Sequence, residues 1–314
     1  MRDISRRELG LGTAAMLFAG TLRRSRGTQA AGAKTRIILL GTAGGPTPRK
    51  TRVPSSQVVV INERAYVFDC GVGVTTQLAR AGVRLGSLRH VFVTHHHSDH
   101  NAEYGPLLLT AWAAGLRTPV DTWGPPPLSR MTQLFLEMNE YDIRTRMEDE
   151  GRVPLEPLIK PHEQEQGGVV VSADGVKVTC ALVDHPPVKP AFAYRLDSAD
   201  RSVVFSGDTR PSKALIELAR GADVLVHEVI WPTVIDRLVA NAYNAEALKK
   251  SILSHHTAAE DVGRIAAEAQ VKTLVLSHFV PAEDPEITEQ MWIGAVQSGG
   301  YKGPIVLGKD LLEI

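Results

Sequence analysis

Four side chains that could bind a metal ion stand within six residues of this chain: His95, His97, Asp99 and His100. They directly follow residues 90–94, an apolar run that predicts a buried strand. Zinc accepts imidazole and carboxylate ligands, and a loop at a strand end can aim them at one or two ions. Histidine-rich runs also bind metals adventitiously, but a carboxylate inside the run and an apolar strand before it favour a built site.

The order of short motifs along the chain resembles one protein family. The pattern HxHxDH is the signature of the metallo-β-lactamase superfamily, and here it spans residues 95–100. Supporting motifs of its tRNase Z and arylsulfatase-like branch follow in order over about residues 35–280. They are Leu40-Gly41-Thr42, Gly45-Pro46, Phe68-Asp69-Cys70-Gly71, His185 before Ala193-Tyr194-Arg195, Ser206-Gly207-Asp208-Thr209, His227-Glu228, His255-His256-Thr257 and Ser277-His278-Phe279.

The resemblance implies an α/β fold, the four-layer αββα sandwich, that holds two zinc ions per chain. Its ligand pattern assigns His95, His97 and His185 to one ion, Asp99, His100 and His278 to the other, and Asp208 as a bridge. Taken alone, His185 could simply cap a strand end and Asp208 could simply close a turn. A hydroxide that bridges the ions would then attack the substrate, because coordination to zinc lowers the pKa of water toward about 7.

The resemblance also implies a catalytic histidine beside the metals, and the His-x-Thr spacing selects His255. Its role would be to stabilise developing negative charge or to protonate the leaving group. His227 and Glu228 match a pair that orients this histidine, and Asp99 belongs to both the ligands and the catalytic residues. The alternative for His255 is an ordinary position at a helix N-terminus. Trp231 is predicted to form a wall of the substrate pocket.

Alternating short strands and helices must position these groups. The patterns predict strands at residues 36–40, 57–61, 64–69, 90–94, 169–171, 176–183, 192–196, 202–206, 223–227 and 273–277. Helices are predicted at residues 213–220 and 260–270, and the stretch 105–166 is predicted to be mainly helical. Thr257 with Glu260 has the spacing of a capping box, which would begin the helix at residue 260.

Charge bears on the substrate. Basic and acidic side chains both number 35, but residues 1–30 hold six arginines and two acidic residues, so the remainder carries 29 basic against 33 acidic groups, a net formal charge of −4. Nucleic-acid-binding proteins usually present a basic face. We therefore expect a small-molecule ester substrate, cleaved at a phosphodiester or sulfate ester bond, and expect nucleic acid to be an unlikely partner.

Three alternative functions stay open in the sequence. The first is tRNA 3′-end processing, against which Val72 stands where the tRNase branch commonly has Glu. The second is a lactonase or β-lactamase, with which the two aspartates of the ligand set are compatible. The third is a metal-stabilised binding protein without turnover, which the complete ligand set disfavours. A homodimer is also left open.

The first 30 residues resemble an export signal. Arg2, Arg6 and Arg7 precede the uncharged stretch 9–22, which is short for a stable membrane span, and residues 5–9 resemble a twin-arginine motif. An ordinary amphipathic helix or an uncleaved anchor is the alternative. We therefore expect an export signal at residues 1–30, a metallo-β-lactamase-fold hydrolase domain at residues 31–314, and a periplasmic or secreted protein.

Overall fold

The computed structural model describes residues 35–314, which belong to one compact unit. Two seven-stranded sheets make up its centre. The first sheet has the order β14 (Leu312–Glu313), β1 (Arg36–Gly41), β2 (Ser56–Ile61), β3 (Arg64–Phe68), β4 (Leu88–Phe92), β5 (Val120–Gly124) and β6 (Ile159–Glu163). The second has the order β13 (Ile305–Leu307), β12 (Thr273–Val280), β11 (Val224–Ile230), β10 (Ser202–Phe205), β9 (Phe192–Asp197), β8 (Val176–Leu182) and β7 (Gly168–Ala173).

Helices connect and cover the strands. They are α1 (Val74–Arg80), α2 (Ser98–Asn101), α3 (Tyr104–Ala113), α4 (Leu128–Met138), α5 (Glu140–Glu150), α6 (Lys213–Ala219), α7 (Ile235–Val239), α8 (Ala245–His255), α9 (Ala259–Ala269) and α10 (Glu289–Ser298). Short 3-10 turns lie at Leu85–Ser87, Glu156–Leu158 and Pro232–Val234. Among residues 35–314, no helix is both long and apolar enough to cross a bilayer.

Strand β1 shows why the sheets stack. Side chains of a strand alternate between its two faces, and a strand buried on both faces is apolar throughout. Ile37 and Leu39 point into the core between the sheets, where Phe68 and Tyr194 also pack. Ile38 belongs to the outer core of the first sheet. The apolar run of β1 therefore binds one sheet to the other and to the helices outside.

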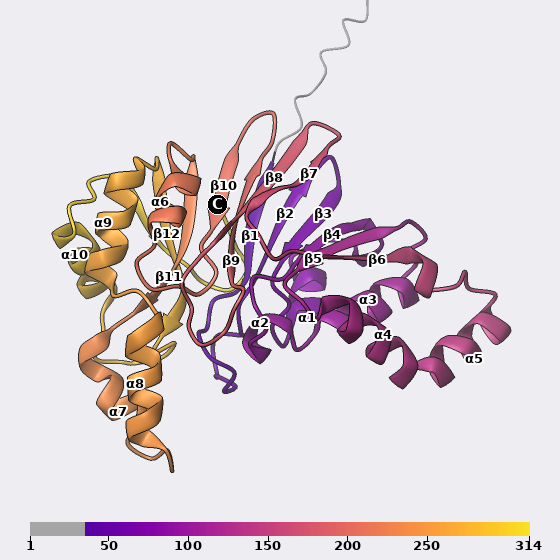
Figure 1. The fold of residues 1–314 in the computed structure, drawn as a ribbon, viewed down its shortest axis with the longest axis horizontal. Coiled ribbons are helices and arrows are strands. Elements are labelled where there is room, and N and C mark those ends of the chain that lie inside the picture. Colours follow the sequence, from indigo (N-terminus) through magenta and orange to yellow (C-terminus); the bar gives the residue numbers. More distant parts are fainter. Residues whose placement is uncertain (1–34) are drawn as a thin grey trace, which may run out of the picture. The chain divides into compact units, whose positions relative to one another are not determined.

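The outer layers are helical. Side chains of α1 and α3, Trp112 among them, pack on the outer face of the first sheet. Helices α6, α9 and α10 cover the second sheet, with Ile265 and Val296 in that core. Figure 1 shows the same sequence of layers, with α6, α9 and α10 on one side and α1 to α3 on the other. The predicted αββα sandwich is confirmed.

Two details differ from the sequence patterns. The stretch 105–166, predicted to be mainly helical, also contains β5 and β6, which extend the first sheet by parallel pairing. Helix α9 begins at Ala259 without a side-chain cap, so the capping box predicted for Thr257 is wrong. The Thr257 hydroxyl donates instead to the Thr209 carbonyl oxygen at 2.6 Å. Its hydrogen bond is therefore used to fix the turn that follows Asp208.

Parallel strand ends bring the polar motifs together. Strands β3, β4 and β5 run parallel in the first sheet, and β10, β11 and β12 run parallel in the second. The carboxyl edge of such a sheet is where α/β proteins place their sites. Asp69 follows β3, His95 follows β4 and Asp208 follows β10, while His278 lies near the end of β12. Segments far apart in the chain thus meet at one edge.

Candidate active site

Two of the groups of side chains that could hold a metal ion share one carboxylate. The first comprises His95, His97, His185 and Asp208, and the ligand atoms lie within 4.8 Å of one another. Nδ1 of His97 lies 3.1 Å from Nε2 of both His95 and His185. All but His97 are buried. These residues are the set that the resemblance assigned to one ion, together with the bridging carboxylate.

The second group contains Asp99, His100, His278 and again Asp208. Nε2 of His278 lies 3.3 Å from Asp99 Oδ2 and 3.2 Å from Asp208 Oδ2. His100 Nε2 lies 3.3 Å from Asp208 Oδ1. The Gly45 backbone N–H donates to Asp99 at 2.9 Å and holds that carboxylate in place. The structure therefore brings together all seven predicted ligands.

The chemistry of the cluster fits a bound cation. His100 Nε2 and Asp208 Oδ1 are buried, and neither has a hydrogen-bond partner among the described residues. Burial lowers the pKa of His185 to about 3, which leaves its imidazole neutral and able to act as a ligand. Burial opposes charge on His100 as well, but Asp208, Asp69 and Asp99 outweigh it and raise its pKa. The buried carboxylates thus favour positive charge between them.

Asp69 positions the cluster, and the sequence did not assign it a role. His100 Nδ1–H donates to Asp69 at 2.7 Å, which leaves Nε2 of the ring toward the other ligands. The same carboxylate accepts from the Thr94 backbone N–H at 2.8 Å and from its hydroxyl at 3.0 Å. The Asp69 carboxylate therefore fixes both the start of the loop that carries the histidines and the orientation of the His100 ring. Its place after β3, beside the strand that ends in the histidines, is the signal that could have found it.

Asp69→Asn is expected to weaken zinc binding by about 10- to 100-fold, because the partners of metal-binding histidines set ring orientation and basicity. A competition titration against a chelating dye measures this effect. Asp121→Asn is the matched control, since Asp121 accepts from His162 Nε2 at 2.7 Å on the surface, outside both ligand groups. Equal zinc affinities for the two variants would contradict the role of Asp69.

Gly207 forms the turn that presents Asp208. Its φ is +57°, and a Cβ there would lie 2.7 Å from the Phe192 carbonyl oxygen and 3.0 Å from Thr94 Cβ. Both the left-handed backbone and the close approach therefore require glycine.

Gly207→Ala is expected to lower the free energy of unfolding by more than the about 1–2 kcal/mol that a left-handed alanine costs, because of the added clash, and to reduce activity by moving Asp208. Gly221→Ala separates the two effects. Gly221 has φ +65° with open space around it, so its replacement introduces the backbone strain alone. Urea unfolding and activity assays are carried out on both variants. Equal losses of unfolding free energy in Gly207→Ala and Gly221→Ala would contradict the effect of the clash.

Glu228 orients His256, whereas the sequence pattern pointed to His255. His256 Nδ1–H donates to Glu228 Oε1 at 3.1 Å and lies 3.9 Å from Asp208 Oδ2. Glu228 Oε1 also accepts from the backbone N–H groups of Thr209 and Thr257. Burial opposes charge on His256, but the Glu228 carboxylate outweighs it and raises its pKa to about 9. The geometry supplies a protonated imidazole beside the ligand cluster.

His255 and His227 are placed differently from the expectation. His255 Nδ1–H donates to the Pro186 carbonyl oxygen at 2.8 Å, and its carbonyl oxygen contacts His185 Nδ1 at 3.1 Å. His227 is fully buried, and its Nδ1–H donates to the carbonyl oxygen of Glu228 rather than to either candidate histidine. The expected pair of His227 and Glu228 thus does not contact His255. His255 still lies beside the cluster, with its ring centroid 4.5 Å from that of His185.

A cavity of about 490 Å³ opens onto the cluster. The site residues that line it are His97, Asp99, Asp208, His255, His256 and His278. The other side is formed by the hairpin of α7 and α8 and by the loop that contains Arg49. Trp231, predicted as a wall, packs instead on Trp292 with ring centroids 5.0 Å apart. The expected wall is therefore replaced by the hairpin that follows it in the chain.

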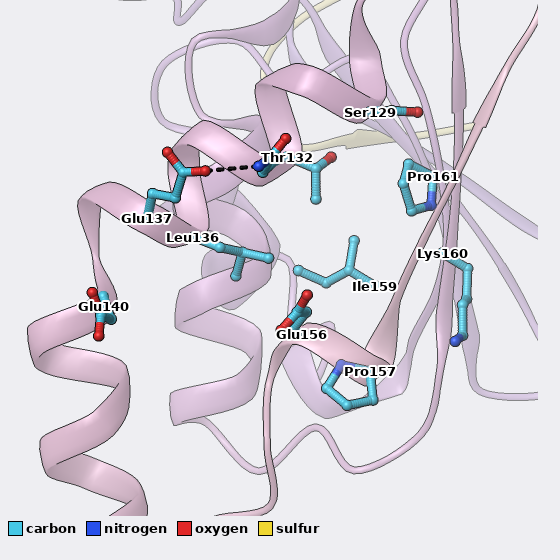
Figure 2. Close-up of a pocket in the computed structure, with 11 residues that line it drawn as sticks. Ser129, Thr132, Leu136, Glu137, Glu140, Glu156, Pro157, Ile159, Lys160 and Pro161 are labelled. Atoms are coloured by element: carbon cyan, nitrogen blue, oxygen red, sulfur yellow. Dashed lines mark hydrogen bonds between the residues drawn. The ribbon is translucent and has the colours of Figure 1, made fainter.

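A larger cavity, of about 640 Å³, lies away from the cluster between α4 and β6. Figure 2 shows Leu136 and Ile159 facing across it, with Glu137 bonded to Gln133 on the helix. Neither ligand group contributes a residue to its lining. Size alone does not mark the reactive site, because the convergent polar groups lie in the smaller cavity.

Comparison with known proteins shows the family. The family model described as anti-Pycsar protein Apyc1 matches residues 35–275. A protein named Ribonuclease Z from Mycobacterium bovis is 36% identical over 281 residues, which cover 88% of this chain and 97% of the relative. The chain belongs to the tRNase Z branch of the metallo-β-lactamase superfamily. It is accordingly a metal-dependent hydrolase of that superfamily, as the motif order predicted.

Solved structures agree with this fold. Human tRNase Z, short form, matches with a TM-score of 0.62 at 20% identity, over 89% of this chain and 98% of the other. Zinc-bound PqqB from Methylobacterium extorquens matches with a TM-score of 0.60 at 16% identity, over 89% and 99%. One protein with a similar fold, PqqB, is therefore zinc-bound. This chain has groups of candidate metal ligands of its own.

The expected substrate is corrected by the relatives. An enzyme for small phosphodiesters or sulfate esters, arylsulfatase-like and without a nucleic-acid partner, conflicts with relatives named Ribonuclease Z at 34–36% identity. The expectation rested on the net charge of −4, on the segment that resembles an export signal and on Val72. Net charge counts every surface group, whereas phosphate binding depends on the local field, and here Arg49 and a cation-binding cluster share one cavity.

The expected location is corrected on the same finding. A periplasmic or secreted protein with a twin-arginine signal conflicts with membership of the tRNase Z branch and relatives named Ribonuclease Z. Residues 1–30, on which the expectation rested, lie outside the described residues, and the boundary at residue 30 stays a prediction.

Proposed function

We propose that this protein is a tRNA 3′-processing endonuclease that cleaves a phosphodiester bond of precursor tRNA. The observation that carries the proposal is the 36% identity to the Mycobacterium bovis protein named Ribonuclease Z, over nearly the full length of that relative. The cluster supports it, because all seven candidate ligands meet beside one open cavity. This function is the first of the three alternatives that the sequence left open.

The proposed metal centre takes two zinc ions. His95, His97 and His185 would hold one ion and Asp99, His100 and His278 the other, with Asp208 shared between them. When bound, zinc activates water as a nucleophile at neutral pH and offsets the negative charge that develops on a phosphoryl group. The chain's own contribution is to hold the ligands in place, through Asp69 on His100 and Gly45 on Asp99.

We propose that His256 serves the leaving oxygen. Glu228 fixes the ring and favours its protonated form, and His256 lines the cavity next to Asp208. A positioned acid of this kind protonates a departing alkoxide as the bond to phosphorus breaks. His255, selected by the motif spacing, lines the same cavity, so its catalytic role stays a prediction. A comparison of His255→Ala with His256→Ala tests it.

The test uses zinc-loaded full-length protein and a precursor tRNA with a 3′ trailer, with the ends of the products mapped. We expect one cut at the 3′ end of the acceptor stem, with kcat/KM at least about 100-fold above that for a bis-aryl phosphodiester, because remote binding energy is used at the reacting bond. An aryl sulfate and a lactone serve as comparison substrates. Random cutting of the RNA, or faster turnover of a small ester, would overturn the proposal.

A further inference from the structure

One wall of the active-site cavity is apolar, although a phosphate needs no such wall. The hairpin of α7 and α8 contributes seven of the lining residues, and all but the serine and the histidine are apolar: Leu238, Val239, Ala242, Leu248, Ser251, Ile252 and His255. This hairpin packs on Ile230 and Val280 through its own small core, so the wall is held rigidly against the sheet. Metal ligands and His256 face it across the cavity.

A cation completes the lining on another side. Arg49 lies on the loop after β1 and lines the cavity; its side chain is half-buried, and its Nε has no hydrogen-bond partner among the described residues. Hydrogen bonds from Thr51 and, to a smaller extent, the charge of Arg49 lower the pKa of Glu283. A guanidinium in the lining can form charge-assisted hydrogen bonds to a phosphate, so Arg49 supplies a suitable cation for an anionic group in the cavity. The cavity thus combines a place for a phosphate, a cation near it and an apolar surface.

We infer that this cavity is a nucleotide subsite in which the α7–α8 wall covers the face of the base next to the scissile phosphate. A base is flat and apolar on its face, and a cavity of about 490 Å³ lies in the size range of small-ligand sites. The inference rests on the proposed function. It adds that the site contacts the base of the nucleotide as well as the phosphate. Arg49 pairs with the phosphate group of the same nucleotide.

The composition of the wall also sets its selectivity. Hydrogen bonds to base edges distinguish one base from another, whereas contact with the face of a base is sequence-tolerant. Within the hairpin, the lining has two polar side chains, Ser251 and His255, and His255 Nδ1–H already donates to the Pro186 carbonyl oxygen. The four nucleotides are therefore bound with similar affinity, within about threefold of one another, while removal of the base weakens binding.

The test compares AMP with ribose 5-phosphate by calorimetry on zinc-loaded protein, because these probes differ only by the base. We expect AMP to bind at least about fivefold more tightly, because burial of the face of the base against an aliphatic wall is favourable by about 25 cal/mol per Å² of apolar surface. CMP, GMP and UMP should lie close to AMP. Equal Kd values for AMP and ribose 5-phosphate would overturn the inference.

A matched pair of variants locates the subsite. Ala242→Leu fills the space against the wall, whereas Ala240→Leu adds the same side chain at an exposed position that does not line the cavity. The ratio of the Kd for ribose 5-phosphate to the Kd for AMP should fall toward one in Ala242→Leu and stay unchanged in Ala240→Leu. Thermal unfolding of both variants checks that they are folded. A ratio unaffected by Ala242→Leu would place the base elsewhere and overturn the inference.

Failure of the proposed function gives a different pattern. Absence of precursor tRNA cleavage, together with a preserved base-dependent Kd ratio, would refute tRNA processing and leave the nucleotide subsite in place. Precursor tRNA cleavage with equal Kd values would refute the subsite alone. Arg49→Gln should weaken AMP and ribose 5-phosphate alike, because both carry the phosphate, and an effect confined to AMP would contradict its assignment.

Discussion

Asp208→Ala is expected to abolish hydrolysis, with kcat/KM falling by well over the about 100-fold that loss of a mere positioning partner costs. Asp208 is the one residue shared by both ligand groups, and its carboxylate lies 3.2–3.3 Å from His278 and His100. Without it, two imidazoles would lose their anionic neighbour, and each of the two proposed zinc ions would lose a ligand. Zinc content, measured by mass spectrometry, should fall together with activity.

Asp184→Ala is the control for this prediction. Asp184 precedes His185 in the chain, but its side chain is exposed and lies 3.7 Å from Arg210, outside both groups. Its replacement should leave activity within about twofold, since exposed ion pairs contribute little. An Asp208→Ala enzyme that kept a tenth or more of wild-type turnover would contradict the assignment of the bridge.

His256→Ala is expected to lower kcat by about 100- to 10,000-fold with little change in KM, because a positioned general acid acts in the transition state. His255→Ala should cost less than about tenfold. The difference follows from Glu228, which bonds His256 while His255 is turned to the Pro186 carbonyl oxygen. Steady-state kinetics on precursor tRNA measures both variants.

Added imidazole provides a second measurement for His256. Imidazole, a small diffusible acid, should restore part of the activity of His256→Ala, whereas it should not restore Asp208→Ala, because imidazole cannot replace a carboxylate shared by both candidate ligand groups. His162→Ala, which removes a surface histidine bonded to Asp121, should behave as wild type. A larger loss in His255→Ala than in His256→Ala would return the catalytic role to the residue selected by spacing.

The sequence predicted the fold and the ligand set because these are written in local patterns. Apolar runs such as β1 alternate between two cores, and HxHxDH places four ligands in one loop. The distant ligands, such as His278, could be found only through the resemblance, because chain separation hides their proximity. Parallel strand ends bring them to one edge, which is a property of the fold rather than of the motif.

Other features depended on contacts that spacing cannot show. Asp69 acts because β3 pairs with β4, so its role appears only when the sheet order is known. The choice between adjacent histidines depends on backbone direction: His255 ends α8, whereas His256 is extended, with φ −120° and ψ 170°. Successive side chains there point to different neighbours. The α7–α8 hairpin was likewise missed, because α7 has only 5 residues and His255 is the one buried residue of α8, so no buried apolar face marks either helix clearly.

The most direct test of the account is a zinc titration of chelator-treated protein, with bound metal counted by native mass spectrometry and precursor tRNA cleavage followed in the same samples. We expect cleavage of precursor tRNA to rise with bound zinc and to level off at two ions per chain. The Asp208→Ala variant should neither bind two zinc ions nor cleave precursor tRNA. Full cleavage by metal-free protein, or two bound ions without any cleavage of precursor tRNA, would contradict the account.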